Sequence, residues 1–178
     1  MMLPDSGERR QFDSGAVRDI AQGKGRCDLM PLSVVGRYIG QNCLTHIDEY
    51  LYTGEVNCLS AALGEFMDKC DLDPYTGFLE VAKHFEDGAV KYGDRNWEKG
   101  IPVHCYIDSA VRHYLKFYRG DDDEPHNRAF MWNILCAIWT HEHYPGLRDI
   151  PAYYPTKETT CYESYTCTSN SLSRGDHR

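Results

Sequence analysis

Acidic, basic and histidine side chains are concentrated between His84 and Asn133. This stretch reads HFEDGAVKYGDRNWEKGIPVHCYIDSAVRHYLKFYRGDDDEPHNRAFMWN, and its apolar residues recur with the spacing of helices. A helix that only needs to fold places its charges on one solvated face. Here carboxylates, guanidinium groups and imidazoles recur on three successive segments. That combination is what a site for a metal ion and a polyphosphate requires.

The first candidate is Glu86, in a helix expected over 76–92. Glu86 lies on a flank shared with Leu79 and Val90, where a desolvated carboxylate needs a cation. Two roles stay open for it, a metal ligand or a salt-bridge partner. The helical spacing predicts a buried apolar face made of Phe78, Ala82, Phe85, Ala89 and Tyr92. The opposite, solvated face is predicted to carry Glu80, His84, Asp87 and Lys91.

A second group of candidates lies in the helix expected over 105–119. Asp108 and Arg112 have the i, i+4 spacing of a simple ion pair. Alternatively the acid faces a metal ion while the Arg112 guanidinium binds phosphate oxygens through its two parallel N–H groups. The neighbouring His113 is either a core histidine or a functional one.

The densest acidic cluster is the run from Asp121 to Glu124. Acids before a helix complement its dipole and its N-cap, and this explains one or two of them. Four in a row repel one another, which favours a nearby hard divalent ion such as Mg²⁺ or Mn²⁺. His126 and Asn133 follow at a spacing of seven and share a helical face. A buried Asn133 would need a hydrogen-bond partner.

The segment Gly23-Lys24-Gly25-Arg26 resembles a phosphate-cradling loop, but it is not a Walker A motif because no Ser or Thr follows the lysine. Other hydrolase signatures are missing from the sequence. We find no His-Asp pair, no acidic helix of the Nudix type and no zinc-ligand pairing of cysteines.

Composition limits the class of protein. The chain has 178 residues, which suits a single domain, and a net charge of −8, which argues against binding nucleic acid through a basic surface. No signal segment or membrane-spanning apolar run occurs. The eight cysteines include no CxxC pair, and we interpret them as reduced thiols of a cytoplasmic protein, with a disulfide set in a secreted protein as the alternative.

The periodicity predicts an all-α helical bundle. A flexible tail, or an arm exchanged between subunits, is expected over 151–178, where Ser, Thr and Tyr dominate. Residues 1–150 would form one domain. Its first part, 12–31, should be extended or loop with a helical turn around Ala16–Ala21. Helices are expected over 32–53 (one or two), 56–70, 76–92, 105–119 and 124–143.

Four blocks of the chain resemble the phage dATP/dGTP diphosphohydrolases, the MazZ-like proteins. They are residues 12–31, 84–102, 108–115 and 123–133, in matching order and spacing. Relative to shorter members, 40–76 looks like an insertion. The resemblance implies a MazG-like all-α NTP pyrophosphohydrolase architecture, assembled as a homodimer or homotetramer, with Mg²⁺ or Mn²⁺ bound to helix carboxylates. The paired ExxE or ExxD motifs of MazG-type enzymes are not clean here, since only Glu65 and Asp68 have that spacing.

The implied reaction converts dGTP or dATP and water to the monophosphate and pyrophosphate. In phages with 2-aminoadenine DNA, it would run in the host cytoplasm, supplying dGMP and depleting dATP. A non-catalytic nucleotide-binding or sensing module of the same fold is the alternative, and a structural protein with a Tyr-rich tail is a third reading.

Residue roles follow from the resemblance and from charge. Trp97 would stack on the base, unless it only plugs the core, and Asn96 would read the base edge. The expected metal ligands are Glu86, Asp108, Asp123 and Glu124. The expected catalytic residues are Glu86, Asp108, Lys91 and Arg112. Substrate binding is expected from Lys24, Arg26, Asp28, Asn96, Trp97, His113, His126 and Asn133.

Overall fold

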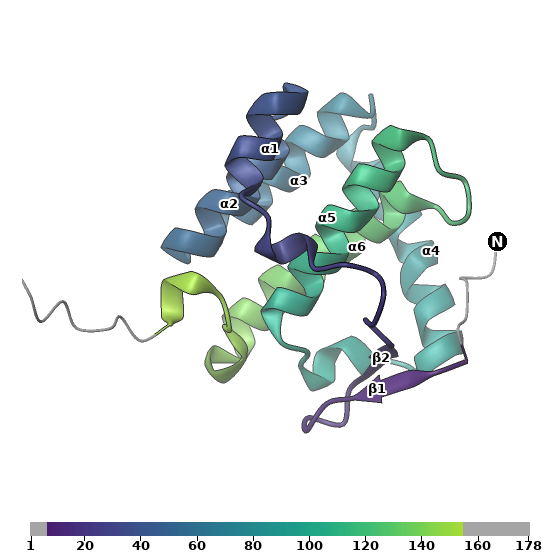
Figure 1. Ribbon diagram of the computed structural model, residues 1–178. Helices are drawn as coiled ribbons and strands as arrows, with labels where there is room; N and C mark the ends of the chain where they lie inside the picture. The colour runs from purple at the N-terminus through teal and green to yellow at the C-terminus, as the bar shows by residue number, and fades with distance from the viewer. Residues whose placement is uncertain (1–6, 155–178) are drawn as a thin grey trace, which may run out of the picture.

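Two long helices, α5 (Val103–Arg119) and α6 (His126–His143), form the centre of the molecule in a computed structural model that describes residues 7–154. They pack against each other, and the other helices surround them (Figure 1). Gly120, with φ 85°, ends α5, and α6 begins directly after Pro125. The predicted all-α bundle is confirmed for the described residues.

Three shorter helices cover one side of the central pair: α1 (Leu32–Ile39), α2 (Cys43–Thr53) and α3 (Asn57–Lys69). The segment expected to hold one or two helices therefore holds two, because Gly40 adopts a left-handed conformation (φ 68°) and ends α1. The region interpreted as an insertion is well packed. It supplies fully buried side chains that include Leu44, Ile47, Tyr50 and Phe66.

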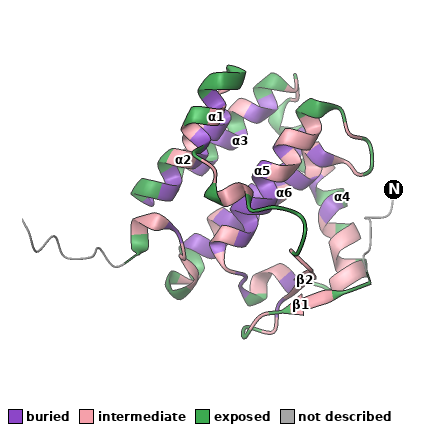
Figure 2. Cartoon of the chain, viewed as in Figure 1, coloured by how far each residue is buried: buried purple, intermediate pink, exposed green. Residues whose placement is uncertain are grey.

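The fourth helix, α4 (Pro74–Tyr92), lies on the opposite side and packs on α6. Asp73 caps it by accepting a hydrogen bond from the Thr76 amide at 3.1 Å. The predicted faces of this helix are only partly right, since Phe85 packs on Trp97 and Trp132 as expected but other positions differ. His84, expected in solvent, is 7% exposed and packs its ring on Trp132, whereas Phe78, expected in the core, is 45% exposed. Most of α4 is intermediate or exposed, in contrast to the largely buried central helices (Figure 2).

The apolar residues of α4 are distributed around most of the helix circumference. Their periodicity therefore did not identify which face is buried. Gly77, Val81 and His84 are buried, while Leu79 and Val90 stay exposed. The side chain of Glu86 is exposed as well, so the desolvation argued for it is also wrong.

A short antiparallel hairpin precedes the helices, formed by β1 (Arg9–Gln11) and β2 (Val17–Asp19). The helical turn predicted around Ala16–Ala21 is therefore wrong. The strand is held from outside the hairpin, since the Asn96 side chain accepts from the Val17 amide at 3.0 Å and donates to the Val17 carbonyl at 2.9 Å. The chain then crosses α5 with a single turn, η1 (Cys27–Leu29).

The chain after α6 turns back through η3 (Pro145–Leu147) and η4 (Pro151–Tyr153). Ile150 is buried between them. The tail predicted over 151–178 lies outside the described residues from 155 onward. Among residues 7–154, no helix combines the length and apolar character needed to cross a bilayer, and the six cysteines of this part are free thiols.

Candidate functional site

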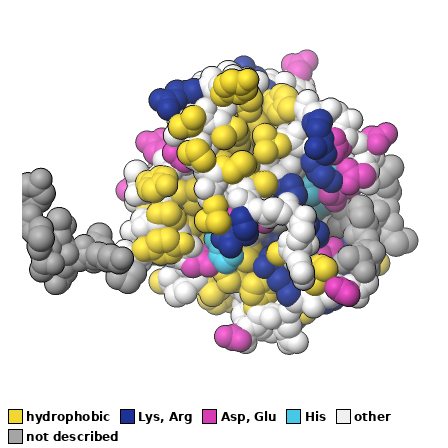
Figure 3. Space-filling model, viewed as in Figure 1, with side chains coloured by type: hydrophobic (Ala, Val, Ile, Leu, Met, Phe, Trp, Pro, Cys, Tyr) yellow, Lys and Arg dark blue, Asp and Glu magenta, His cyan; other side chains and the backbone are white. Residues whose placement is uncertain are grey.

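One large cavity, of about 790 Å³, opens between the hairpin segment, α4, α5 and the start of α6. Its volume is within the range of small-molecule sites. Lys and Arg side chains gather on this part of the surface, whereas apolar side chains gather over α1 and α2 (Figure 3). The turn η2 (Asn96–Lys99), which follows α4, closes one end.

Arg18 is at the centre of the cavity lining. Its guanidinium donates to Ser109 Oγ at 3.1 Å, to Asn133 Oδ1 at 2.9 Å and to the Cys105 carbonyl at 3.3 Å. It also lies over the rings of Tyr106 and Trp132. All of these partners are neutral, so a full positive charge is fixed in the cavity wall.

The loop that carries Lys24 is fixed to α5 by Asp108 and Arg112. Asp108 accepts from the Cys27 amide at 2.7 Å and from Arg112, and it is 4% exposed. Arg112 in turn donates to the carbonyl of Lys24 at 3.1 Å. The pair therefore positions the loop, and the i, i+4 ion pair anticipated from the spacing is present.

A group of four cations faces the cavity: Arg18, Lys24, Lys91 and Arg112. Lys91 forms an ion pair with Asp19 at 2.8 Å. Among residues 7–154, the Lys24 ammonium has no ion-pair partner. Desolvation at the cavity wall lowers the pKa of Lys24; the Asp19 carboxylate opposes this shift, and the nearby cations Arg112, Lys91 and Arg18 add to it. Asp19 and Asp108 balance two of the four cations, which leaves Arg18 and Lys24 as the excess positive charge that an anionic ligand would bind.

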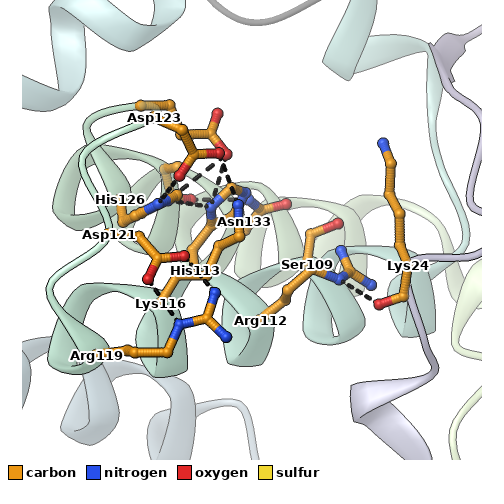
Figure 4. Close-up of polar contacts among 12 residues, drawn as sticks. Lys24, Ser109, Arg112, His113, Lys116, Arg119, Asp121, Asp123, His126 and Asn133 are labelled. Atoms are coloured by element: carbon orange, nitrogen blue, oxygen red, sulfur yellow. Dashed lines mark hydrogen bonds and ion pairs between the residues drawn. The ribbon is translucent and has the colours of Figure 1, made fainter. Parts of the chain in front are cut away.

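A histidine–carboxylate cluster (His113, Asp123, Glu124 and His126) lies where α5 turns into α6 (Figure 4). The two Nδ1 atoms of His113 and His126 are 3.1 Å apart, and Glu124 Oε1 is 3.3 Å and 3.5 Å from them respectively. Burial raises the pKa of Glu124 and lowers that of His113 well below its usual value. On the outer side, Asp123 accepts from His126 Nε2 at 2.8 Å and from Lys116 at 2.7 Å.

Aromatic side chains form the remaining wall. Trp97 packs edge-on against Phe85 and Trp139, so it plugs the core and also lines the cavity. Trp132 lines it as well, and its indole Nε1 is a buried donor without a hydrogen-bond partner among the described residues. Indole and phenyl rings of this kind offer stacking surface to a flat ring system.

Residues 64–150 match the model of the family described as dATP/dGTP diphosphohydrolase, N-terminal. The matched segment, just under half of the chain, is similar to the dATP/dGTP diphosphohydrolase family. The match includes α4, α5, α6 and the whole histidine–carboxylate cluster, while the hairpin and Lys24 precede it. Searches of curated proteins and of solved structures gave no match.

Most of the residues that the sequence analysis expected in the site line the cavity. They are Lys24, Glu86, Lys91, Asn96, Trp97, Asp108, Arg112, His113, Asp123, Glu124 and Asn133. Arg26 and Asp28 do not, and they pair with each other at 2.7 Å. His126 lies behind His113 and is 2% exposed. Asn133 has the partner that its burial required, Arg18.

The structure also adds residues that the sequence analysis missed: Arg18, Asp19, His84, Lys116 and Trp132. A signal existed only for Trp132, an aromatic beside Asn133 in an otherwise apolar stretch. Arg18 lies within a block that was matched as a whole, and nothing local distinguished it from the neighbouring charges.

Proposed function

We propose that the protein hydrolyses a purine deoxynucleoside triphosphate, dGTP or dATP, to the monophosphate and pyrophosphate with a divalent cation, Mg²⁺ or Mn²⁺. The observation that carries this proposal is one cavity that combines a cationic group, a histidine–carboxylate cluster and aromatic walls. The family match names the same substrates. In a phage with 2-aminoadenine DNA, the reaction would supply dGMP in the host cytoplasm and deplete dATP.

The donor set near Glu124 fits a divalent cation. Glu124 faces two imidazole nitrogens, and among the described residues no lysine or arginine is paired with it. Asp123 and Asp108 fit less well as direct ligands. The oxygens of Asp123 are engaged by His126 and Lys116, and those of Asp108 by the Cys27 amide and Arg112. When bound, such an ion would neutralise phosphate charge as a Lewis acid.

The other residues have roles that follow from their contacts. Lys24, Lys91 and Arg18 would bind the phosphates and stabilise charge on the leaving pyrophosphate. Arg112 would act with Asp108 as a positioning pair for the Lys24 loop, with its remaining N–H groups directed to phosphate. Glu86 lies at the exposed edge of the cavity. It stays our candidate for a carboxylate on α4 that takes part in metal binding and catalysis.

The base would stack on the aromatic wall, against Trp97 or Trp132. Asn96 is less suited to read the base edge than the sequence suggested, because both ends of its amide already bond the Val17 backbone. The unpaired Trp132 Nε1 and the buried His84 Nδ1 are alternative polar contacts for a purine.

The test is a pyrophosphate-release assay on the full chain with each of the four deoxynucleoside triphosphates, in Mg²⁺, in Mn²⁺ and in chelator. We expect cation-dependent pyrophosphate from dGTP or dATP. Release of single phosphates would refute the proposed reaction. Tight purine nucleotide binding without turnover under either cation would support the sensing module instead.

A further inference from the structure

The three ligand atoms of His113, Glu124 and His126 are spaced like the ligands of one metal ion. A tetrahedral ion with bonds of about 2.05 Å holds its ligand atoms about 3.3 Å apart. The separations here are 3.1, 3.3 and 3.5 Å. No backbone movement is therefore needed for all three atoms to reach a single ion.

The imidazole of His126 is oriented for coordination. Asp123 accepts a hydrogen bond at 2.8 Å from His126 Nε2, which places the hydrogen of the neutral ring on that nitrogen. The lone pair of Nδ1 then points toward His113 and Glu124. A carboxylate on the far nitrogen is the usual outer partner of a metal-bound histidine. Asp123 is itself fixed by Lys116 at 2.7 Å.

The cluster is enclosed on one side and open on the other. His126 is 2% exposed and lies within the protein, while His113 and Glu124 line the cavity. An ion held by the three residues would keep its free coordination positions toward the cavity. This is the arrangement of catalytic sites with three protein ligands, in contrast to closed structural sites.

We propose that His113, Glu124 and His126 form a His₂–carboxylate site for a divalent transition metal ion, such as Mn²⁺, Fe²⁺, Co²⁺ or Zn²⁺. Mg²⁺ is then not the preferred ion at this site. Imidazole suits these ions, whereas Mg²⁺ takes oxygen ligands and keeps much of its water. The inference deepens the proposed function by naming the class of ion and its ligands. It departs from the all-carboxylate set that the family resemblance implies.

The experiment measures binding of Co²⁺ to the metal-free full chain, by its visible d–d absorption and by equilibrium dialysis, followed by competition with Mn²⁺, Zn²⁺ and Mg²⁺. We expect one Co²⁺ per chain, displaced by Zn²⁺ and by a large excess of Mn²⁺, and not by the same excess of Mg²⁺. His113→Gln, His126→Gln and Glu124→Gln should each weaken binding by at least about 100-fold, and Asp123→Asn by about 10–100-fold.

The matched control is Asp122→Asn, which removes one charge from the same acidic run at an exposed position. It should bind Co²⁺ as the wild type does. If a ligand variant does not fold, the wild-type protein still gives a direct answer, because pulsed EPR of bound Mn²⁺ detects imidazole nitrogen. Absence of that nitrogen signal, or binding that survives both histidine substitutions, would overturn the inference.

The two proposals fail separately. Histidine-dependent metal binding in a protein that hydrolyses no nucleotide would leave the metal site standing and refute the enzyme. If Mg²⁺ supports hydrolysis of dGTP as well as Mn²⁺ does, and the His113→Gln variant is as active as the wild type, the proposed enzyme activity stands and this metal site is refuted.

Discussion

Replacement of Arg18 by Met should destabilise the protein measurably, because Arg18 links the hairpin to both central helices. Met keeps much of the side chain's length and loses its hydrogen bonds. Asn133, 2% exposed, would then hold an acceptor without its partner, at a cost of about 1–3 kcal/mol. Loss of the cation–π contacts with Tyr106 and Trp132 adds about 0.5–1 kcal/mol each at partly exposed sites.

The expected loss is thus about 2–5 kcal/mol, which is a large part of the about 5–15 kcal/mol by which a typical domain is stable. It corresponds to a Tm lowered by about 4–20 °C in a chain of this size. Thermal and urea unfolding monitored by circular dichroism would measure it. Arg37→Met, on the exposed surface of α1, is the matched control and should stay within about 0.5 kcal/mol of wild type.

A double-mutant cycle isolates the contact on which this reasoning depends. Asn133→Leu removes the acceptor that Arg18→Met leaves unpaired, so the double variant should be more stable than the sum of the single losses by about 0.5–3 kcal/mol. Additive effects, or a single Arg18→Met variant with wild-type stability, would refute the role assigned to this hydrogen bond.

Three further expectations follow from other contacts. Lys24→Met should leave Tm unchanged or higher, because it removes a partly desolvated ammonium that has no ion-pair partner among the described residues. The Tm increase produced by dGTP should shrink, and a lower Tm without ligand would contradict this. Glu86→Gln, at an exposed position, should keep wild-type stability and lose pyrophosphate release, and full activity would remove Glu86 from the site. The Asp149 carboxylate raises the pKa of His104 to about 10, so this contact stabilises the fold below pH 6.5 and is lost as pH rises through 10. Because both side chains are partly exposed, His104→Gln should cost about 1 kcal/mol at pH 6 and nothing near pH 11, and a deficit that grows with pH in urea titrations would refute this sign.

The helices were predictable because local signals define their ends. Pro74, Gly93, Gly120 and Pro125 lie at or beside the observed boundaries of α4, α5 and α6. These residues act through their own backbone conformation, which needs no information from distant parts of the chain.

The buried face of α4 and the β1–β2 hairpin were not predictable from local signals. The strand at Val17 depends on the amide of Asn96, 79 positions away in sequence, and the burial of His84 depends on Trp132 of another helix. The site shows the same division. Asp108 and Arg112 were found as a pair one helical turn apart, whereas Arg18 is defined by Ser109 and Asn133, far along the chain.

The charges of the cavity form two groups that a single type of ligand would satisfy together. Arg18, Lys24, Lys91 and Arg112 offer positive charge. Arg18 is held by neutral groups, and Arg112 is held by Asp108 and by the Lys24 carbonyl. The cluster around Glu124 offers donor atoms for a cation. A polyphosphate alone would leave that cluster without its ion, and a metal ion alone would leave the repulsion among the cations. Binding of a nucleotide together with a divalent ion relieves both, so we expect the two ligands to stabilise the fold cooperatively, by more than the sum of their separate effects.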